Sequence, residues 1–171
     1  MKTVKVRIEG ISPLLQHRFP EEANPENKSK KKIKEYIAQI DCETALYKDE
    51  KGNIYQPSTH IFGCLIKAGS RFNFEKKQTY SSIIKSSLIV LPEAIPHIYK
   101  EWEIDRRNVV IQRARIMRAR PRFNKWALEF KIEFDDELIG KDKLKEILDF
   151  AGQRIGIGDY QQRHTLWWGR F

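Results

Sequence analysis

The clearest strand pattern in the sequence lies at residues 125–134, which read KWALEFKIEF. Large apolar residues alternate there with small or charged ones, and the apolar set is Trp126, Leu128, Phe130, Ile132 and Phe134. Such alternation is typical of a β-strand with one buried face. We therefore expect these side chains, including that of Trp126, to lie in a hydrophobic core beneath a sheet.

The elements on either side of this strand predict the order of the fold. Residues 4–8, 88–91 and 109–122 have strand patterns, and residues 57–69 and 141–153 have apolar residues at helical spacing. We expect residues 121–125 to connect the strands at 109–122 and 125–134 as a hairpin. A last strand is expected at 169–171. With residues 20–56 set aside as an insertion, the order is that of the split βαβ, or ferredoxin-like, fold.

We therefore predict an α+β fold with one RRM-like domain over residues 1–171 and an antiparallel sheet with helices on one face. A helical insertion is expected at about residues 20–56, and a protruding basic β-hairpin at about residues 106–134. Because RNA-binding sheets of this topology use their uncovered face, that face is a candidate binding surface.

Length and charge narrow the class of protein. At roughly 150 residues per domain, 171 residues are about one domain. The charge difference, 32 − 23 = +9, favours an anionic partner, with nucleic acid ahead of a membrane surface. The longest apolar runs, such as 88–91, are too short to cross a membrane. The first ten residues lack the apolar core of a signal peptide.

The two cysteines limit the disulfides and metal sites that the chain can form. Cys42 and Cys64 alone cannot form a disulfide framework or a zinc site. We therefore expect a cytoplasmic protein without a metal or another cofactor.

The strongest functional signal is a run of arginines without an acidic residue between them. Seven fall within seventeen residues, namely Arg106, Arg107, Arg113, Arg115, Arg118, Arg120 and Arg122. On a strand, arginines two apart project on the same side at about 6.6 Å, which is close to the phosphate spacing of a nucleic-acid strand. Guanidinium groups bind phosphate in a planar fork and stack on bases, for which Phe123 and Trp102 offer further rings. The alternative interpretation is a solvent-exposed edge strand whose charges prevent edge-to-edge aggregation.

A second basic stretch follows the helix at 141–153. Gly156 and Gly158 allow positive φ and close approach of a ligand, or else they cap the helix and form a tight turn. Basic and aromatic neighbours favour phosphate contact, and they are Arg154, Arg163, Trp167, Trp168 and Arg170. Arg18, next to His17, suits a phosphate site as well.

Three short motifs resemble those of the RAMP superfamily, the RRM-like RNA-binding proteins of CRISPR systems. They are ISPLL at 11–15 after the first strand, YQPSTHI at 55–61 opening a helix, and the glycine-rich tail that ends in Gly169-Arg170-Phe171. The resemblance extends to the subunits that form the guide-RNA backbone of effector complexes and to small phage or prophage proteins. It implies binding of RNA or single-stranded DNA without sequence readout, with the glycine loop and arginine hairpin lining the strand. It also implies head-to-tail assembly, as a homo-oligomer or with effector-complex subunits.

Histidines supply the only candidates for catalysis. Some RAMP proteins cleave RNA with a histidine, and here His17 beside Arg18 and His164 in the basic tail suit that role best. No histidines have metal-ligand spacing, and Asp135-Asp136-Glu137 has the composition of a solvated turn. Binding without catalysis is therefore the main prediction. The alternatives are a metal-independent endoribonuclease and a phage structural or assembly protein with an acidic protein partner.

Overall fold

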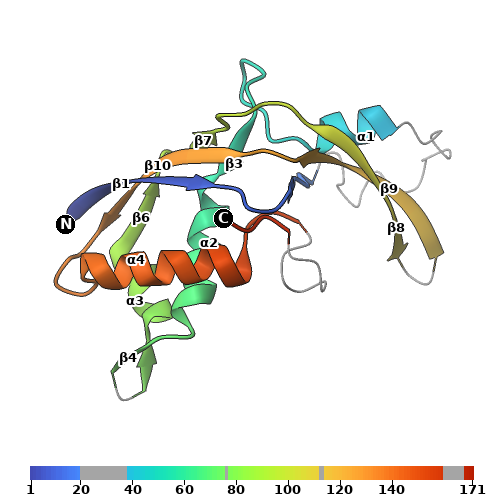
Figure 1. Cartoon of the computed structure of the whole chain (residues 1–171). Helices are drawn as coiled ribbons and strands as arrows, with labels where there is room; N and C mark the ends of the chain where they lie inside the picture. Colours follow the sequence, from blue (N-terminus) through green and yellow to red (C-terminus); the bar gives the residue numbers. More distant parts are fainter. Residues whose placement is uncertain (20–37, 76, 112–113, 160–167) are drawn as a thin grey trace, which may run out of the picture.

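The core of the fold is a three-stranded antiparallel sheet (Figure 1). The computed structural model describes residues 1–19, 38–75, 77–111, 114–159 and 168–171, and side chains in all of these except 109–111 and 114–116. The sheet has the order β1 (Lys2–Glu9), β10 (Ala127–Phe134), β6 (Leu88–Leu91), so β10 lies in the middle. Val6 lies opposite Phe130, and Val90 lies opposite Ile132. The three strands expected at 4–8, 88–91 and 125–134 are therefore present.

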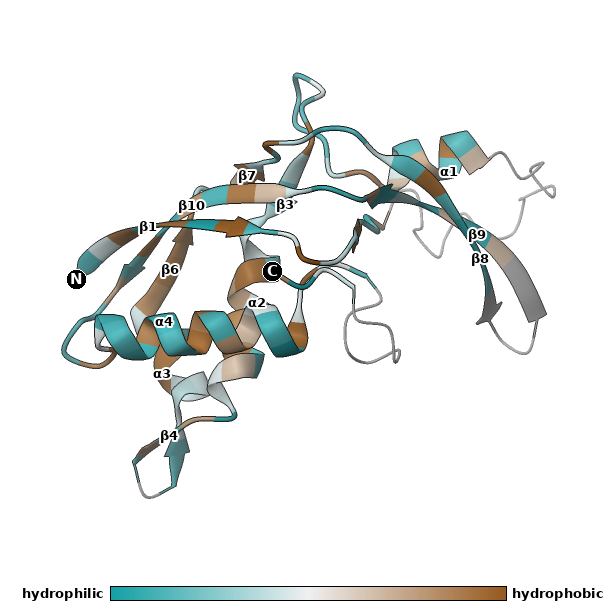
Figure 2. Ribbon diagram, in the orientation of Figure 1, coloured by the Kyte–Doolittle hydropathy of each residue, from teal (hydrophilic) through white to brown (hydrophobic). Residues whose placement is uncertain are grey.

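Helices cover one face of this sheet and bury its apolar side chains. α2 (Ser58–Gly69) and α3 (Tyr80–Ser87) pack together, and α4 (Lys141–Phe150) lies beside α2 (Figure 1). The alternating residues Leu128, Phe130 and Ile132 of β10 are all buried. Trp126 is 1% exposed and its Nε1 donates to the carbonyl of Ser12 at 2.8 Å, which confirms its place in the core. Figure 2 shows hydrophobic residues along α2 and the central strands.

The opposite face of the sheet is open, as expected, but its chemistry is not that of an RRM. Arg7 forms ion pairs there with Glu9 and Glu129, at 2.7 and 3.0 Å. Lys131 and Leu91 lie opposite each other and are exposed. RRM sheets stack bases on aromatic side chains. The outward residues of β1, β10 and β6, all of them described, include no aromatic ring.

A second antiparallel sheet has the order β2 (Leu14–Leu15), β9 (Ala114–Phe123), β8 (Glu103–Ile111). β8 and β9 form a long hairpin that extends away from the central sheet (Figure 1). The expected hairpin at 106–134 is therefore wrong in its pairing, because β9 pairs with β8 and β10 belongs to the other sheet. The physical reason lies between β9 and β10, where Phe123 and Trp126 are buried and lead the chain from one sheet to the other.

One face of the hairpin is covered by α1 (Ala38–Ala45). Ala38 and Cys42 of α1 pack against Ala119 of β9. The expected helix within 20–56 is thus present for its described part, and residues 20–37 lie outside the described residues. A turn at 49–53 follows α1, and Lys48 and Ile54 on either side of it form an antiparallel bridge.

Smaller elements complete the fold. β3 (Tyr55–Pro57) pairs with β7 (Ala94–Pro96), and β4 (Asn73–Glu75) pairs with β5 (Gln78–Thr79). A π-helical turn, Ala151–Ile155, extends α4. No helix within the described ranges is long and apolar enough to cross a membrane.

The end of the chain returns beside the segment that follows β1. The Ile11 amide donates to the carbonyl of Arg170 at 2.9 Å, and the Gly169 amide donates to that of Pro13 at 2.8 Å. These bonds replace the strand expected at 169–171, which is not formed. They bring Trp168 close to the hairpin.

Candidate nucleic-acid interface

The strand register divides the hairpin into two faces. Residues directly opposite each other in an antiparallel pair share a face. Arg122 lies opposite Glu103, Arg120 opposite Asp105, and Arg118 opposite Arg107. These six residues form what we call the arginine face, and the predicted same-side placement of Arg118, Arg120 and Arg122 is confirmed. Arg106 belongs with Ala119 to the other face, which packs on α1.

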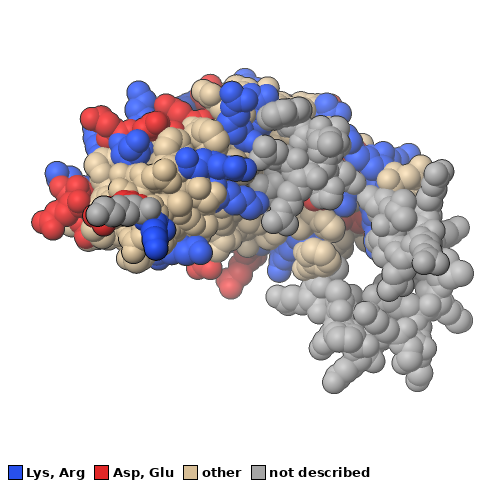
Figure 3. Space-filling view, turned by 90° about the horizontal axis from the view of Figure 1, so that it is seen from below, with Lys and Arg blue, Asp and Glu red and all other residues tan. Residues whose placement is uncertain are grey.

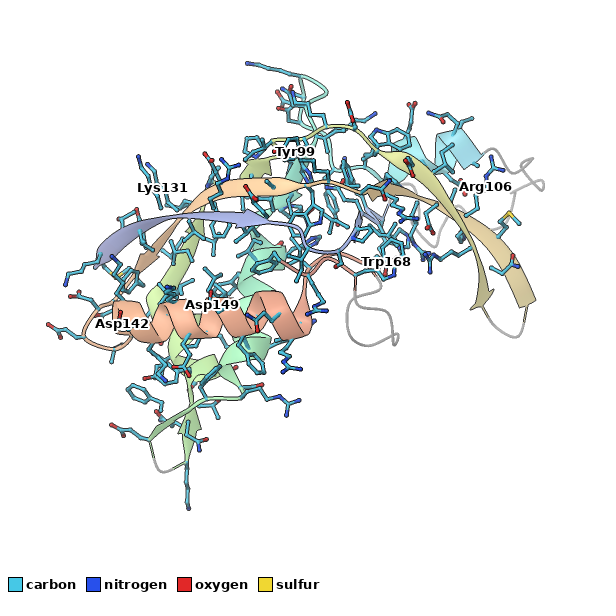
Figure 4. The ribbon with its side chains drawn as sticks, in the orientation of Figure 1. Tyr99, Arg106, Lys131, Asp142, Asp149 and Trp168 are labelled. Carbon is cyan, nitrogen blue, oxygen red and sulfur yellow. The ribbon has the colours of Figure 1, made fainter. Side chains whose placement is uncertain are left out.

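Trp168 of the C-terminal tail lies against the arginine face. Its ring centre is 4.5 Å from Cζ of Arg107 and 5.1 Å from Cζ of Arg122. Figure 4 shows Trp168 on the side of the hairpin away from α1. Cation–π contacts of this length are favourable by about 0.5–1 kcal/mol at exposed sites. Two parts of the chain that sequence analysis treated separately, hairpin and tail, therefore meet.

The arginines of the face are not equivalent. Arg107 forms a two-pronged pair with Asp105, with Nε–Oδ1 at 2.5 Å and Nη2–Oδ2 at 3.1 Å. Arg120 is nearly buried, and its Nε lies 2.6 Å from Oδ2 of Asp159. Within the described part of the chain, Arg118 and Arg122 have no carboxylate within 4 Å. The carboxylates of Asp105 and Asp159 therefore hold Arg107 and Arg120 in place.

His17 is placed by the same aspartate. Its Nδ1 lies 3.5 Å from Oδ2 of Asp159, and its ring stacks on Phe19 with centroids 4.9 Å apart and an interplanar angle of 25°. Phe19 is 76% exposed. Asp159 therefore contacts both Arg120 and His17, and the His17 ring stacks on the exposed ring of Phe19. Phe19 was not among the site residues predicted from the sequence. Arg18 is half-buried, and its amide donates to the carbonyl of Ala45 at 2.9 Å.

A buried polar network holds the segment before His17. Gln16 is 1% exposed, and its Nε2 donates to the Tyr55 carbonyl at 2.9 Å and to Oε1 of Gln56 at 3.0 Å. Nε2 of His97 lies 3.2 Å from the same nitrogen and 3.5 Å from Oε1 of Gln56. Burial lowers the pKa of His97 to about 4, so His97 is neutral near pH 7.

The glycine loop packs against other backbone. Gly156 has φ +75°, and a Cβ there would lie 2.7 Å from the carbonyl oxygen of Trp168. Gly158 has φ +82°, and its Cβ would lie 2.5 Å from the carbonyl oxygen of Leu15. Both positions therefore require glycine for packing. Phosphate contact at Gly156 and Gly158 stays a prediction.

A small pocket between α2 and this loop was not predicted. It has a volume of about 190 Å³ and is lined by Thr59, His60, Gly63, Cys64, Lys67 and Gly158. Burial lowers the pKa of His60 and raises that of Cys64 to about 12, so both are neutral near pH 7. The available signal was Gly63, because glycine inside a helix costs about 1 kcal/mol and needs a reason. Here the glycine leaves the pocket open, since its Cβ would meet nothing within 4 Å.

The remaining predicted residues are placed as follows. Arg154 is exposed on the π-helical turn, and Arg170 contributes its backbone to the contact with residues 11–12. Arg115 lies opposite Val110 in the hairpin, without a described side chain. Arg113, Arg163, His164 and Trp167 lie outside the described residues.

Charge is unevenly distributed over the molecule. In Figure 3, acidic side chains gather at one end of the view, and basic side chains line the middle as far as the segments drawn in grey. Asp135 accepts from the Glu137 amide at 3.0 Å, and Asp136 pairs with Lys2, so the acidic triplet forms a turn, as expected. Among the described side chains, no three potential metal ligands lie together.

No model of a known protein family matches the sequence, and a search of curated proteins finds no significant similarity. The functional proposal therefore depends on the geometry of the chain itself.

Proposed function

We propose that this protein binds single-stranded nucleic acid, RNA in particular, along the arginine face, without reading most of its sequence. The observation that carries the proposal is Trp168, whose ring contacts the guanidinium groups of both Arg107 and Arg122 on a ribbon of aligned arginines. Guanidinium groups and aromatic rings together are the usual means of binding a strand by its phosphates and base faces.

Phosphates would contact Arg118 and Arg122, the two cations of the face for which the described residues supply no carboxylate partner. Bases would stack on exposed rings, for which the His17–Phe19 pair is one candidate through its link to Asp159 and Arg120. The pocket beside Gly158, with Lys67 and the Thr59 hydroxyl, offers a further phosphate position. Binding of this kind weakens steeply with salt, because phosphate contacts release counterions.

The fold and the resemblance support finer proposals. The sheet order β1-β10-β6, with α2 and α4 on one face, has three of the four strands of a ferredoxin-like or RRM-like sheet. We propose that fold, and with it assembly of RAMP type, either as a homo-oligomer or with effector-complex subunits. Two free cysteines suit a reducing, cytoplasmic location.

The test is a titration of labelled single-stranded RNA, single-stranded DNA and duplex at several salt concentrations. Wild type is compared with Arg118→Ala, Arg122→Ala and, as matched control, Arg7→Ala, whose guanidinium is paired on the open sheet face. Each of the first two should weaken binding to all sequences alike and lower the salt slope by about 1, or slightly less. Arg7→Ala should have no effect. Equal affinities for all four proteins would refute the proposal.

A second candidate function, metal-independent RNA cleavage, is favoured by one contact. Asp159 lies against Nδ1 of His17, which leaves Nε2 of a half-exposed imidazole available as a general base. His17→Ala should then abolish cleavage in metal-free buffer without loss of binding, and a 2′-deoxy substitution at the cut position should do the same. Cleavage by His17→Ala would exclude this residue. No binding of any nucleic acid at low salt would favour an assembly protein with an acidic partner.

A further inference from the structure

A pocket at the base of the hairpin has the properties of a nucleobase site. Its volume is about 270 Å³, just below the roughly 300–1,000 Å³ of drug-sized ligand sites. The stretch before β8 supplies Tyr99, Glu101 and Trp102, and β8 itself supplies Glu103. The end of β9 and the turn after it supply Arg122 and Lys125. The two sides are far apart in sequence, and the pairing of β8 with β9 brings them together.

Contacts with the core hold one side of the pocket. Trp102 packs against both hydrophobic clusters of the fold, and the Ile98 amide donates to the Ala127 carbonyl at 3.1 Å next to Tyr99. Nζ of Lys125 lies 4.2 Å from the centre of the Tyr99 ring. A flat ligand therefore meets aromatic rings and cations, the groups on which bases stack.

Two carboxylates give this pocket a different chemistry from the rest of the basic surface. Glu101 and Glu103 are exposed at its rim, and neither has an ion-pair partner in the described ranges. Carboxylates repel phosphate but accept hydrogen bonds from exocyclic amino groups, as in the pairing of glutamate with the N4 amine of cytosine. Adenine, cytosine and guanine carry such an amine, whereas uracil presents carbonyl oxygens in its place.

We infer that this pocket takes one nucleobase that carries an exocyclic amine and discriminates against uracil. The inference deepens the proposed function and rests on it for the biological ligand, because Arg122 belongs both to the arginine face and to the pocket. A strand held by phosphates at Arg122 places a neighbouring base at the rim. The protein then tolerates most sequences but prefers an amino base at one position.

The experiment uses nucleosides, which lack the phosphate that the arginine face would bind. The full chain is titrated with cytidine, adenosine and uridine while its amide and indole NMR resonances are followed, and Trp102→Phe identifies the Trp102 indole. Cytidine and adenosine should shift that indole and the Tyr99 amide, and uridine should bind on the order of tenfold more weakly. Shifts absent from the pocket, or equal binding of uridine and cytidine, would overturn the inference.

Variants and oligonucleotides separate the two claims. Glu101→Gln with Glu103→Gln should reduce the preference for cytidine over uridine to about twofold or less, whereas Glu93→Gln, an exposed glutamate before β7, should leave it unchanged. If labelled oligonucleotides bind but nucleosides do not reach the pocket, the inference fails and the proposed function stands. If nucleosides bind in the pocket but oligonucleotides do not bind at low salt, the proposed function fails and the pocket stands.

Discussion

Replacing Arg120 by alanine should destabilise the fold rather than remove a phosphate contact. The Arg120 side chain is 10% exposed and that of Asp159 is 24% exposed, with Nε and Oδ2 2.6 Å apart. The Asp159 amide donates to the carbonyl of Leu15 at 2.9 Å. The ion pair therefore fastens β9 to the glycine loop and to the strand β2.

The expected magnitude follows from this partial burial. Exposed ion pairs contribute about 0–1 kcal/mol, whereas removal of one partner from a fully buried pair costs about 3–5 kcal/mol. With one side chain nearly buried and the other a quarter exposed, Arg120→Ala should lower the free energy of unfolding by about 2–3 kcal/mol. Asp159→Ala should cost a similar amount, because it leaves the buried guanidinium without its carboxylate.

The assay is urea unfolding of the two single variants, the double variant and Arg118→Ala. The double variant should be less destabilised than the two single effects added together, by at least about 1 kcal/mol, since the residues are in contact. Arg118→Ala, on the exposed part of the same face, should stay within about 0.5 kcal/mol of wild type. An effect of Arg120→Ala below about 0.5 kcal/mol, without coupling to Asp159, would refute the structural assignment and return Arg120 to the phosphate contacts.

Three further predictions concern stability and reactivity. Burial lowers the pKa of His97 from 6.5 to about 4, so as the pH falls the unfolded chain takes up a proton at His97 before the folded chain does. The free energy of unfolding should therefore fall by roughly 3 kcal/mol between pH 7 and 4. His97→Gln should flatten the plot of urea midpoint against pH, and parallel plots for wild type and variant would contradict this. Gly169→Ala, at φ +65° against the Ile157 carbonyl, should cost more than about 2 kcal/mol, whereas Gly63→Ala should stabilise by about 0.5–1 kcal/mol, both measured by thermal unfolding. Burial raises the pKa of Cys42 to about 11 and that of Cys64 to about 12, so neither thiol should react with a disulfide reagent at pH 8 before unfolding, and rapid labelling of native protein would show that one is accessible.

The central sheet was predictable because its side chains follow a simple period. β10 and β1 alternate along their whole length, and the parity of Trp126 with Leu128 was enough to place the indole in the core. The pairing of β9 was not predictable in the same way. Its apolar residues follow no regular alternation, and residues 121–125 were expected to form a hairpin loop, whereas in the structure this stretch connects one sheet to the other.

The arginines that share one face of the hairpin were predictable from the sequence, but the acidic residues that pair with them were not. Strand geometry alone placed Arg118, Arg120 and Arg122 on one side. The acidic residues that oppose them lie just before the arginine run, at Glu103 and Asp105, or far along the chain, at Asp159. The contact with Asp159 depends on where the glycine loop packs, and no local spacing in the sequence predicts it.

Because some arginines of the hairpin are held by carboxylates and others are not, the salt dependence of binding tests which of them contact phosphate. For a single strand, the slope of log affinity against log salt is about −0.7 per neutralised phosphate. Arg118 and Arg122 are the members of the arginine face without a carboxylate partner in the described ranges, so two contacts would give a slope of about −1.4. If all seven arginines of the run contacted phosphate, the slope would be about −5. A slope near −1.4 that loses about 0.7 with each of Arg118→Ala and Arg122→Ala assigns the binding to the arginine face. A slope near −5 requires additional contacts, because Arg107 and Arg120 are already held by Asp105 and Asp159.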